Sequence, residues 1–418
     1  MTSDRLSRAA GVLLNPPSER SGIAPFIVMD VMSQAAAAEA AGKNVIHMEV
    51  GQPATSAPRA AREAVKRALD TDKLGYTLAL GMEPLRERIA RLYQEWYGVK
   101  VSPERIVVTS GSSAAFVLSF LALFDSGARV ALPAPGYPCY RHILTALGAE
   151  PTSIETGPNS RWMPTAAQIE DADERQKLQG LLIASPANPT GTMLEPERLA
   201  EITALCRRRG IWFISDEIYH GLTYGVPEAT ALQFSDDVVV INSFSKYFSM
   251  TGWRVGWMVV PEGMVRSVER LAQNLYISPP AVAQVAALGA FDGMDELAAN
   301  KRVYMANRDL LLAELPKAGL AKIVPADGAF YLYVDVGDYT NDSLAFAKQM
   351  LEETAIAATP GVDFDEARGR RFIRFSYAGG TAQMATVPGI SGCRVVFATR
   401  VLDDREIGVL EKRVSRVG

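Results

Sequence analysis

Short hydrophobic runs alternate with longer segments of helical pattern through the middle of the chain. The runs lie at residues 105–110, 128–133, 180–186, 211–217, 237–245 and 254–260. Several are apolar at both alternating positions, which is typical of strands buried on both faces of a sheet. Helical patterns at 112–124 and 140–147 follow the first two runs. The pattern therefore predicts an α/β fold with a mostly parallel sheet.

The last part of the chain has a different pattern. Strand-like segments at 328–336 and 371–378 flank a helical segment at 343–354, which predicts a separate α+β domain. A chain of 418 residues also suits one large and one smaller domain. We predict an N-terminal segment at 1–60 that packs with the small domain, a large domain at 61–305 and a small domain at 306–418. After residue 380 the tail is atypical, because Pro388 and Gly389 interrupt its helical periodicity.

Composition excludes several classes of protein. The net charge is −4, with 48% hydrophobic and 22% charged residues, which is typical of a globular protein and predicts neither nucleic acid nor a membrane surface as partner. The longest helical apolar stretch, 114–124, is shorter than the roughly 20 residues that span a bilayer. The first twenty residues lack a signal peptide's apolar core, so we predict a cytoplasmic protein. Three cysteines and three histidines, widely spaced, predict no disulfide framework and no metal site.

Lys246 stands at the end of an apolar run, in NSFSKYFSMTGWRVGW. Burial disfavours the charged amine, and a neutral lysine is a nucleophile that forms a Schiff base with an aldehyde. The alternative is a lysine whose stem lies on apolar surface while its amine reaches water. The neighbours favour the first interpretation, because Ser243, Ser245 and Arg254 offer hydroxyls and a guanidinium fork to a phosphate.

A second anion-binding element follows the first predicted strand. Gly111, Ser112 and Ser113 open the next helix, where free backbone N–H groups favour an anion. Serine is also an ordinary helix cap, so this segment alone decides little. A nucleophilic lysine together with two phosphate-binding elements indicates an aldehyde cofactor that carries a phosphate, pyridoxal phosphate.

That cofactor needs a carboxylate partner for its pyridine nitrogen and hydrogen bonds to its phenolic oxygen. Asp216 ends a predicted strand and suits the nitrogen, although it also suits a helix cap. Tyr219 and Asn188 are placed to reach the phenolic oxygen, and Tyr137 to stack on the ring. Otherwise Asn188 belongs to an ordinary turn and Tyr137 to the packing.

These motifs, in this order, resemble the class I and II aminotransferases of pyridoxal-phosphate fold type I, the aspartate aminotransferase superfamily. The resemblance extends over residues 25–380 and rests on HMEVGQP, LGYTLALGMEPLRERIA, SPANPTGT, ISDEIY, SFSKYFSMTGWRVGW and FIRFSYA. It implies a large domain with a mostly parallel seven-stranded sheet plus a smaller α+β domain. It also implies an aminotransferase that moves an amino group from an L-amino acid to a 2-oxo acid by ping-pong kinetics.

The resemblance further implies a role for each matching residue. Lys246, Asp216 and Tyr219 would be catalytic, with Lys246 as the Schiff-base lysine. The cofactor-binding residues would be Tyr76, Gly111, Ser112, Ser113, Tyr137, Asn188, Asp216, Tyr219, Ser243, Ser245, Lys246 and Arg254. Gly51, Asn188 and Arg374 would bind the substrate, with Arg374 on its α-carboxylate. Tyr76 would reach the phosphate of the neighbouring subunit, which implies a homodimer with shared active sites.

Three alternatives stay open at this stage. The same fold hosts C–S lyases, which eliminate from cysteine conjugates, and synthases that act on sulfonium amino acids. Aminotransferase-like domains also occur fused to DNA-binding domains, which the short N-terminal segment and negative charge disfavour. For the substrate side chain, Arg20 is a weak candidate for a distal carboxylate, whereas Tyr276 and Ile277 favour apolar or aromatic groups.

Overall fold

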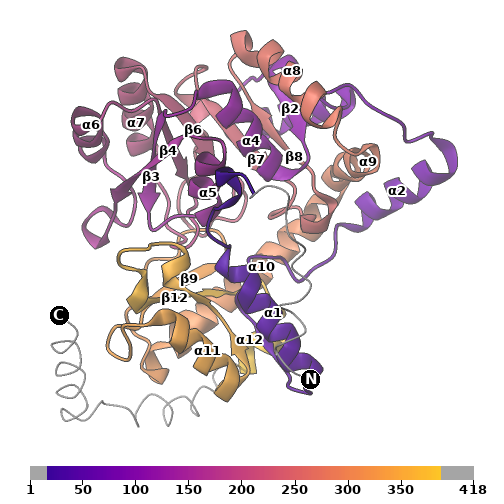
Figure 1. Ribbon diagram of the computed structural model, residues 1–418. Coiled ribbons are helices and arrows are strands. Elements are labelled where there is room, and N and C mark those ends of the chain that lie inside the picture. Colours follow the sequence, from indigo (N-terminus) through magenta and orange to yellow (C-terminus); the bar gives the residue numbers. More distant parts are fainter. Residues whose placement is uncertain (1–16, 387–418) are drawn as a thin grey trace, which may run out of the picture.

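The computed structural model describes residues 17–386, and the tail predicted to be atypical lies largely outside them (Figure 1). The strands are β1 Ile46–His47, β2 Ile106–Thr109, β3 Arg129–Ala134, β4 Glu150–Glu155, β5 Gly180–Ala184, β6 Trp212–Asp216, β7 Val239–Ser243, β8 Gly256–Val259, β9 Tyr331–Asp335, β10 Ile356–Ala357, β11 Thr359–Pro360 and β12 Phe372–Ser376. The helices are α1 Ile27–Ala40, α2 Arg59–Thr71, α3 Glu83–Tyr97, α4 Gly111–Leu123, α5 Pro138–Ala146, α6 Ala166–Arg175, α7 Pro196–Arg209, α8 Val265–Tyr276, α9 Ala281–Ala290, α10 Met294–Glu314, α11 Ser343–Thr354 and α12 Thr381–Thr386.

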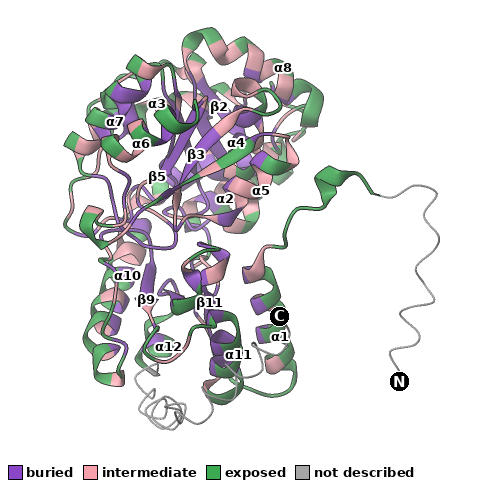
Figure 2. Cartoon of the chain, turned by 60° about the vertical axis from the view of Figure 1, so that its left-hand side comes forward, coloured by how far each residue is buried: buried purple, intermediate pink, exposed green. Residues whose placement is uncertain are grey.

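Seven strands form the main sheet, in the order β2-β8-β7-β6-β5-β3-β4. All neighbours are parallel except β8, which is antiparallel to both β2 and β7. Helices cover both faces, and strands β2, β7 and β8 are buried along their whole length (Figure 2). The predicted α/β fold with a mostly parallel seven-stranded sheet is confirmed.

Strand β4 is the one member of this sheet that the hydrophobic pattern did not single out. It is an edge strand, and most of its side chains are exposed or half-buried. Only Ile154 of this strand is buried, so its sequence EPTSIE carries no hydrophobic run, whereas β2 at the other edge is buried throughout.

Helix ends in the large part follow local sequence rules. Helices α3 and α7 each carry a proline in the first turn, where the missing N–H costs no hydrogen bond. Both end at a glycine with positive φ, Gly98 at 69° and Gly210 at 67°. Glycine adopts this left-handed conformation without a Cβ clash, so the chain can turn back toward the next strand.

The lower part of the molecule in Figure 1 contains an antiparallel sheet in the order β11-β12-β9, with α11 and α12 beside it. Strand β1 pairs in parallel with β10, and α1 packs on the same part through a small apolar cluster that includes Val31, Ala35 and Leu351. The predicted boundary between residues 305 and 306 falls inside the continuous helix α10, so the domain limits stay a prediction.

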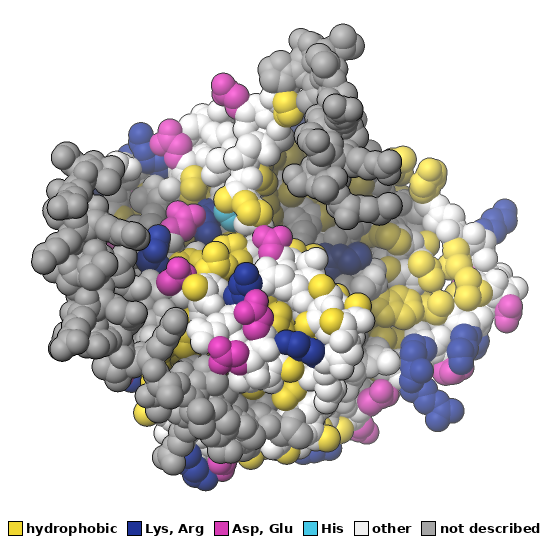
Figure 3. Space-filling view, turned by 60° about the horizontal axis from the view of Figure 1, so that its bottom comes forward, with side chains coloured by type: hydrophobic (Ala, Val, Ile, Leu, Met, Phe, Trp, Pro, Cys, Tyr) yellow, Lys and Arg dark blue, Asp and Glu magenta, His cyan; other side chains and the backbone are white. Residues whose placement is uncertain are grey.

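The described residues show neither a membrane-spanning helix nor a metal-binding group. Within residues 17–386, no helix has both the length and the apolar character needed to cross a membrane, and no group of three or more acidic, histidine or cysteine side chains is arranged to hold a metal ion. On the face shown in Figure 3, charges of both signs are scattered, and hydrophobic side chains gather toward the side where Figure 1 shows α2.

Candidate active site

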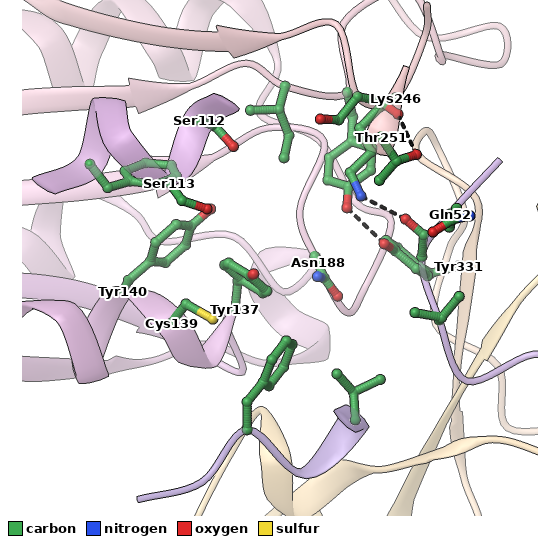
Figure 4. Close-up of a pocket in the computed structure, with 18 of the residues that line it drawn as sticks. Gln52, Ser112, Ser113, Tyr137, Cys139, Tyr140, Asn188, Lys246, Thr251 and Tyr331 are labelled. Atoms are coloured by element: carbon green, nitrogen blue, oxygen red, sulfur yellow. Dashed lines mark hydrogen bonds between the residues drawn. The ribbon is translucent and has the colours of Figure 1, made fainter. Parts of the chain in front are cut away.

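A pocket lies where the carboxyl ends of the central strands meet the β9–β12 part of the molecule. Ten of the predicted site residues line it: Gly51, Ser112, Ser113, Tyr137, Asn188, Tyr219, Ser245, Lys246, Arg254 and Arg374. Figure 4 shows Lys246 across the pocket from Ser112 and Ser113, with Tyr137 and Asn188 between them. Segments more than 300 residues apart in the chain therefore meet at one place.

Lys246 follows β7 and points its amine into the pocket. Its Nζ donates a hydrogen bond of 2.6 Å to the carbonyl oxygen of Gly51. Burial of the amine, together with the positive charges of Arg374 and Arg254, lowers the pKa of Lys246 to about 7, against a smaller opposing effect of Asp216. At neutral pH much of this lysine is therefore a neutral, nucleophilic amine.

Asp216 ends β6 and is only 1% exposed. Its Oδ1 accepts a hydrogen bond of 3.1 Å from the Ile218 N–H, and its Oδ2 accepts one from the Tyr140 hydroxyl. Burial raises the pKa of Asp216 to about 7, although both hydrogen bonds oppose that rise. A cation placed beside this carboxylate would restore its ordinary charge, which suits the nitrogen of a pyridinium ring.

Tyr140 is a site residue that the sequence analysis missed. It lies three residues after Tyr137 on α5, lines the same pocket, and its ring meets that of Tyr137 edge-on at 5.2 Å. The signal was available in YPCY, because residues three apart on a helix share a face. Its contact with Asp216 depends on the fold, since the two lie on different elements.

Tyr331 is a second residue that the sequence did not indicate, and its position explains why residue 51 is a glycine. The Tyr331 hydroxyl lies 2.7 Å from that of Tyr219. A Cβ atom at position 51 would lie 1.7 Å from the Tyr331 hydroxyl oxygen, so no other residue fits there without moving Tyr331. The Lys246 amine lies 5.6 Å from the centre of the Tyr219 ring, so lysine and tyrosines form one wall of the pocket.

Opposite this wall is a cradle suited to an anion. Ser112 and Ser113 lie in the first turn of α4, and Ser245 and Arg254 also line the pocket. Gly111 has φ of 75°, and a Cβ there would lie 2.4 Å from Arg254 Nη2. The guanidinium therefore approaches the helix N-terminus closely, which concentrates positive potential where a phosphate would bind.

Two predicted cradle residues, Gly111 and Ser243, do not line the pocket themselves. The Ser243 hydroxyl donates to Ser245 Oγ at 2.9 Å, so it positions the serine that lines the pocket. Asp216 likewise lies behind the pocket wall rather than in it.

Arg374 reaches the pocket from β12 and is 2% exposed. Its Nη1 donates to Asn188 Oδ1 at 2.8 Å, while Nη2 donates to the Glu49 carbonyl oxygen and to Thr359 Oγ1. Its buried Nε–H has no hydrogen-bond partner among the described residues. The guanidinium thus joins the small sheet to the loop after β5 and keeps a donor available for a carboxylate.

Other predicted contacts lie away from this pocket. Tyr76, on the connection between α2 and α3, is 84% exposed, and Ile277 is 51% exposed. Arg20 is exposed on the N-terminal segment. None of the three lines the pocket, and neither does Tyr276, so a single chain gives them no place in the site.

Comparison with known proteins places this geometry in a family. Residues 43–387 match the family model of class I and II aminotransferases. A valine--pyruvate aminotransferase of Mycobacterium tuberculosis is 48% identical over 364 residues, which cover 86% of this chain and 93% of the relative. The chain belongs to the class I and II aminotransferase family. It is a pyridoxal-phosphate-dependent aminotransferase, as the resemblance implied, and the C–S lyase alternative is not favoured.

Solved structures agree with this assignment. A crystal structure of an aminotransferase from Mycobacterium tuberculosis has a TM-score of 0.90 and 45% identity, over 92% of this chain and all of the other. Aspartate aminotransferase from Thermus thermophilus, solved with maleate, has a TM-score of 0.85 at 28% identity, over 90% of this chain and 99% of the other. The fold type I architecture is therefore confirmed.

The residues present fit the cofactor. The close approach of Arg254 to Gly111 makes the cradle, Lys246 supplies an amine of lowered pKa, and Asp216 supplies a buried carboxylate that lacks a cationic partner among the described residues. The cradle suits the phosphate of pyridoxal phosphate, the amine suits its aldehyde, and the carboxylate suits its pyridine nitrogen.

Proposed function

We propose that this enzyme transfers the amino group of an aliphatic L-amino acid, such as valine, to a small 2-oxo acid, such as pyruvate. The observation that carries this proposal is the set of basic residues in the pocket. Among the described residues that line it, these are Lys246, Arg254 and Arg374, and each has another proposed task. No basic side chain of the described lining is left for a second carboxylate. The 48% identical relative named for valine and pyruvate supports the same substrate class.

The rest of the lining supports an apolar substrate side chain. Phe26, Val28 and Met29 enter the pocket from the start of α1, and Ile143 enters from α5. A carboxylate buried against such side chains without a partner would be strongly disfavoured. An aliphatic side chain in the same place would be stabilised by burial.

Arg374 binds the substrate carboxylate in this proposal. Asn188, Glu49 and Thr359 fix its guanidinium, and the rings of Tyr331 and Phe364 lie 4.4 and 4.7 Å from it. A fork held in this way binds a carboxylate with two hydrogen bonds and sets the direction of the bonds at Cα.

Lys246 moves the proton in this proposal. Its neutral amine takes the proton from the substrate Cα, and the resulting ammonium returns it in the following step. The chemistry supplied by bound pyridoxal phosphate is a conjugated ring that delocalises the electron pair left at Cα. Asp216 would keep the proton on the ring nitrogen, Tyr219 and Asn188 would bind the phenolic oxygen, and Tyr137 would stack on the ring.

The phosphate-binding group comprises Ser112, Ser113, Ser245 and Arg254, with Gly111 and Ser243 as the residues that position them. The N-terminus of α4 and the Arg254 guanidinium both favour a dianion. These residues would anchor the phosphate, so that the aldehyde of the cofactor would lie near the Lys246 amine.

A half-reaction tests the activity and the substrate class together. The enzyme with its cofactor is mixed with one amino acid and no oxo acid, and the absorbance spectrum is followed. We expect valine to convert the cofactor to its amine form with one equivalent of oxo acid, and aspartate to react roughly a hundredfold more slowly because its second carboxylate lacks a partner. Equal rates for aspartate and valine would contradict the aliphatic class. Continued release of ammonia would indicate lyase chemistry instead.

We also propose a homodimer with shared active sites. Large hydrophobic side chains are exposed at Tyr76, Leu78, Leu275 and Ile277. Gln284 holds their two segments together, because it hydrogen-bonds to Thr77 Oγ1 and to the Pro279 carbonyl oxygen, both at 3.0 Å. A surface of this kind is typical of a subunit contact, and Tyr76 is its most exposed member.

The cytoplasmic location stays a prediction from the sequence.

A further inference from the structure

His47, at the end of β1, lies between two carboxylates. Its Nδ1 is 2.8 Å from Glu49 Oε1, and its Nε2 is 3.0 Å from Glu39 Oε1. A neutral imidazole carries a single N–H, so both contacts are hydrogen bonds only when the ring is protonated. The geometry is therefore that of an imidazolium bridging two carboxylates.

The buried partner depends on this histidine. Glu49 is 1% exposed, and its Oε2 has no hydrogen-bond partner among the described residues. His47 Nδ1, next to Oε1 of this carboxylate, donates to it when that ring nitrogen carries a proton. A buried carboxylate that loses its donor is destabilised, so Glu49 responds to the protonation of His47.

The two carboxylates belong to segments that both reach the pocket. Glu39 lies in the last turn of α1, whose first turn supplies Val28 and Met29 to the pocket wall. The carbonyl oxygen of Glu49 accepts hydrogen bonds from Arg374 Nη2 and, at 2.7 Å, from Thr359 Oγ1. His47 thus joins the helix beside the pocket to the backbone that holds Arg374.

The surrounding charges are consistent with a protonated ring. Burial lowers the pKa of His47, but the hydrogen bonds and negative charges of Glu49 and Glu39 outweigh burial, so the pKa is raised above 6.5. The partner strand β10 carries no ionisable side chain.

Other charged groups on the neighbouring elements have their own contacts. On α11, Lys348 lies 3.9 Å from Glu352, and Glu353 accepts from Gln349. Lys43, before β1, donates to the Glu352 carbonyl oxygen, and Arg374 contacts Glu49 through its carbonyl oxygen. Asp30 lies in the first turn of α1, at the opposite end from Glu39.

We propose that His47 is a positioning residue: when protonated it ties α1 to the segment that holds Arg374, and its deprotonation loosens α1 beside the pocket. The consequence for substrate binding rests on the proposed role of Arg374. The consequence for α1 is independent of the role of Arg374, because it concerns only the contacts between His47 and the two glutamates.

Hydrogen–deuterium exchange of the enzyme with its cofactor, without substrate, tests the bridge. Exchange of the α1 amides is compared at about pH 5.5 and about pH 8.5, corrected for intrinsic rates, in the natural protein and in Glu39→Ala. Alanine suits an exposed helix position, so α1 stays folded. We expect a loss of α1 protection of roughly threefold to tenfold at the higher pH in the natural protein, and no pH-dependent loss in Glu39→Ala.

Gln34→Ala is the matched control, since Gln34 is an exposed, uncharged position of the same helix. It should keep the pH response of the natural protein. An equal response in Glu39→Ala, or no response in the natural protein, would overturn the proposal. A parallel measurement of KM and kcat for valine separates the two claims: the KM of the natural protein should rise over the same pH range relative to Glu39→Ala, while the ratio of their kcat values stays constant.

Discussion

Single residues of the site are held in ionisation states that they would not adopt in water. The pKa of Lys246 is lowered from 10.5 to about 7, chiefly because its amine is buried and also because Arg374 and Arg254 lie near it. A lowered lysine pKa means that the neutral amine is populated above about pH 7 rather than above 10.5. This state is needed before the lysine can add to an aldehyde.

The rate at which cofactor-free enzyme recombines with pyridoxal phosphate should follow this ionisation. We expect the rate to rise with pH through about 7 and then to level off, because the reactive amine is then fully formed. Stopped-flow absorbance at the wavelength of the protein-bound cofactor measures it. A rate that still rises tenfold per pH unit above about pH 8 would show that Lys246 keeps an ordinary pKa.

Replacing Lys246 should remove turnover rather than substrate binding. For Lys246→Ala we expect kcat to fall by roughly 10²–10⁴-fold or more, because the side chain that moves the proton is absent. Steady-state kinetics and the absorbance spectrum of the purified variant check this. Lys301→Ala is the control, since Lys301 also has a pKa lowered by burial but lies on α10 outside the pocket. It should keep turnover close to that of the natural protein.

How far the sequence predicts single residues depends on where their partners lie. Lys246, Ser245 and Arg254 stand in one continuous motif, so their common role could be inferred from neighbouring letters. Tyr331 and Glu49 contribute through partners on other elements, and no local pattern distinguishes them from packing residues. For Tyr140 the spacing in YPCY indicates a shared face with Tyr137, but its contact with Asp216 on another element does not follow from that spacing. Their contacts follow from tertiary structure, which a single sequence does not display.

Among the elements, the buried strands are predicted from the sequence and the exposed or very short strands are not. Strands β2, β7 and β8 are buried throughout and were predicted from their apolar runs. Strand β4, with a largely exposed sequence, was not, and the two-residue strands β1, β10 and β11 are too short to show any period. Burial, rather than strand formation itself, is what the hydrophobic pattern records.

The junction between β2 and α4, where Gly111 lies, allows a test of the phosphate cradle. We expect Gly111→Ala to weaken pyridoxal phosphate binding by roughly a hundredfold, because the new Cβ would lie 2.4 Å from Arg254 Nη2 and displace it from the cradle. Equilibrium dialysis of the cofactor-free protein gives the Kd.

Gly127→Ala controls for backbone strain in that experiment. Gly127 has φ of 81°, but no atom lies within 4 Å of the position that a Cβ would take, so its substitution strains the backbone without touching the site. It should lower thermal stability and leave the Kd unchanged. If both variants bound the cofactor equally well, the close approach of Arg254 would not matter for the cradle.

At the scale of the whole molecule, the pocket depends on contacts between distant parts of the chain. Gly51 and Arg374 come from the part that contains β1 and β12, whereas Lys246 and Asp216 come from the main sheet. Hydrogen bonds from Lys246 to Gly51 and from Arg374 to Asn188 cross between the two. Movement of one part relative to the other would therefore change the carboxylate site and the lysine together.

Subunit exchange tests whether a second copy completes this pocket. If Tyr76 of the partner subunit reaches the phosphate, Tyr76→Ala and Lys246→Ala should each lower turnover as homodimers. Refolding the two variants together should restore activity, because in the mixed dimer one site combines the natural Lys246 of one chain with the natural Tyr76 of the other. Random pairing of equal amounts makes about half of the dimers mixed, with one natural site of two, so activity should recover to roughly a quarter of the natural level. Activity no higher than the mean of the two separate variants would mean that each chain builds its site alone, and the exposure of Tyr76 would then need another explanation.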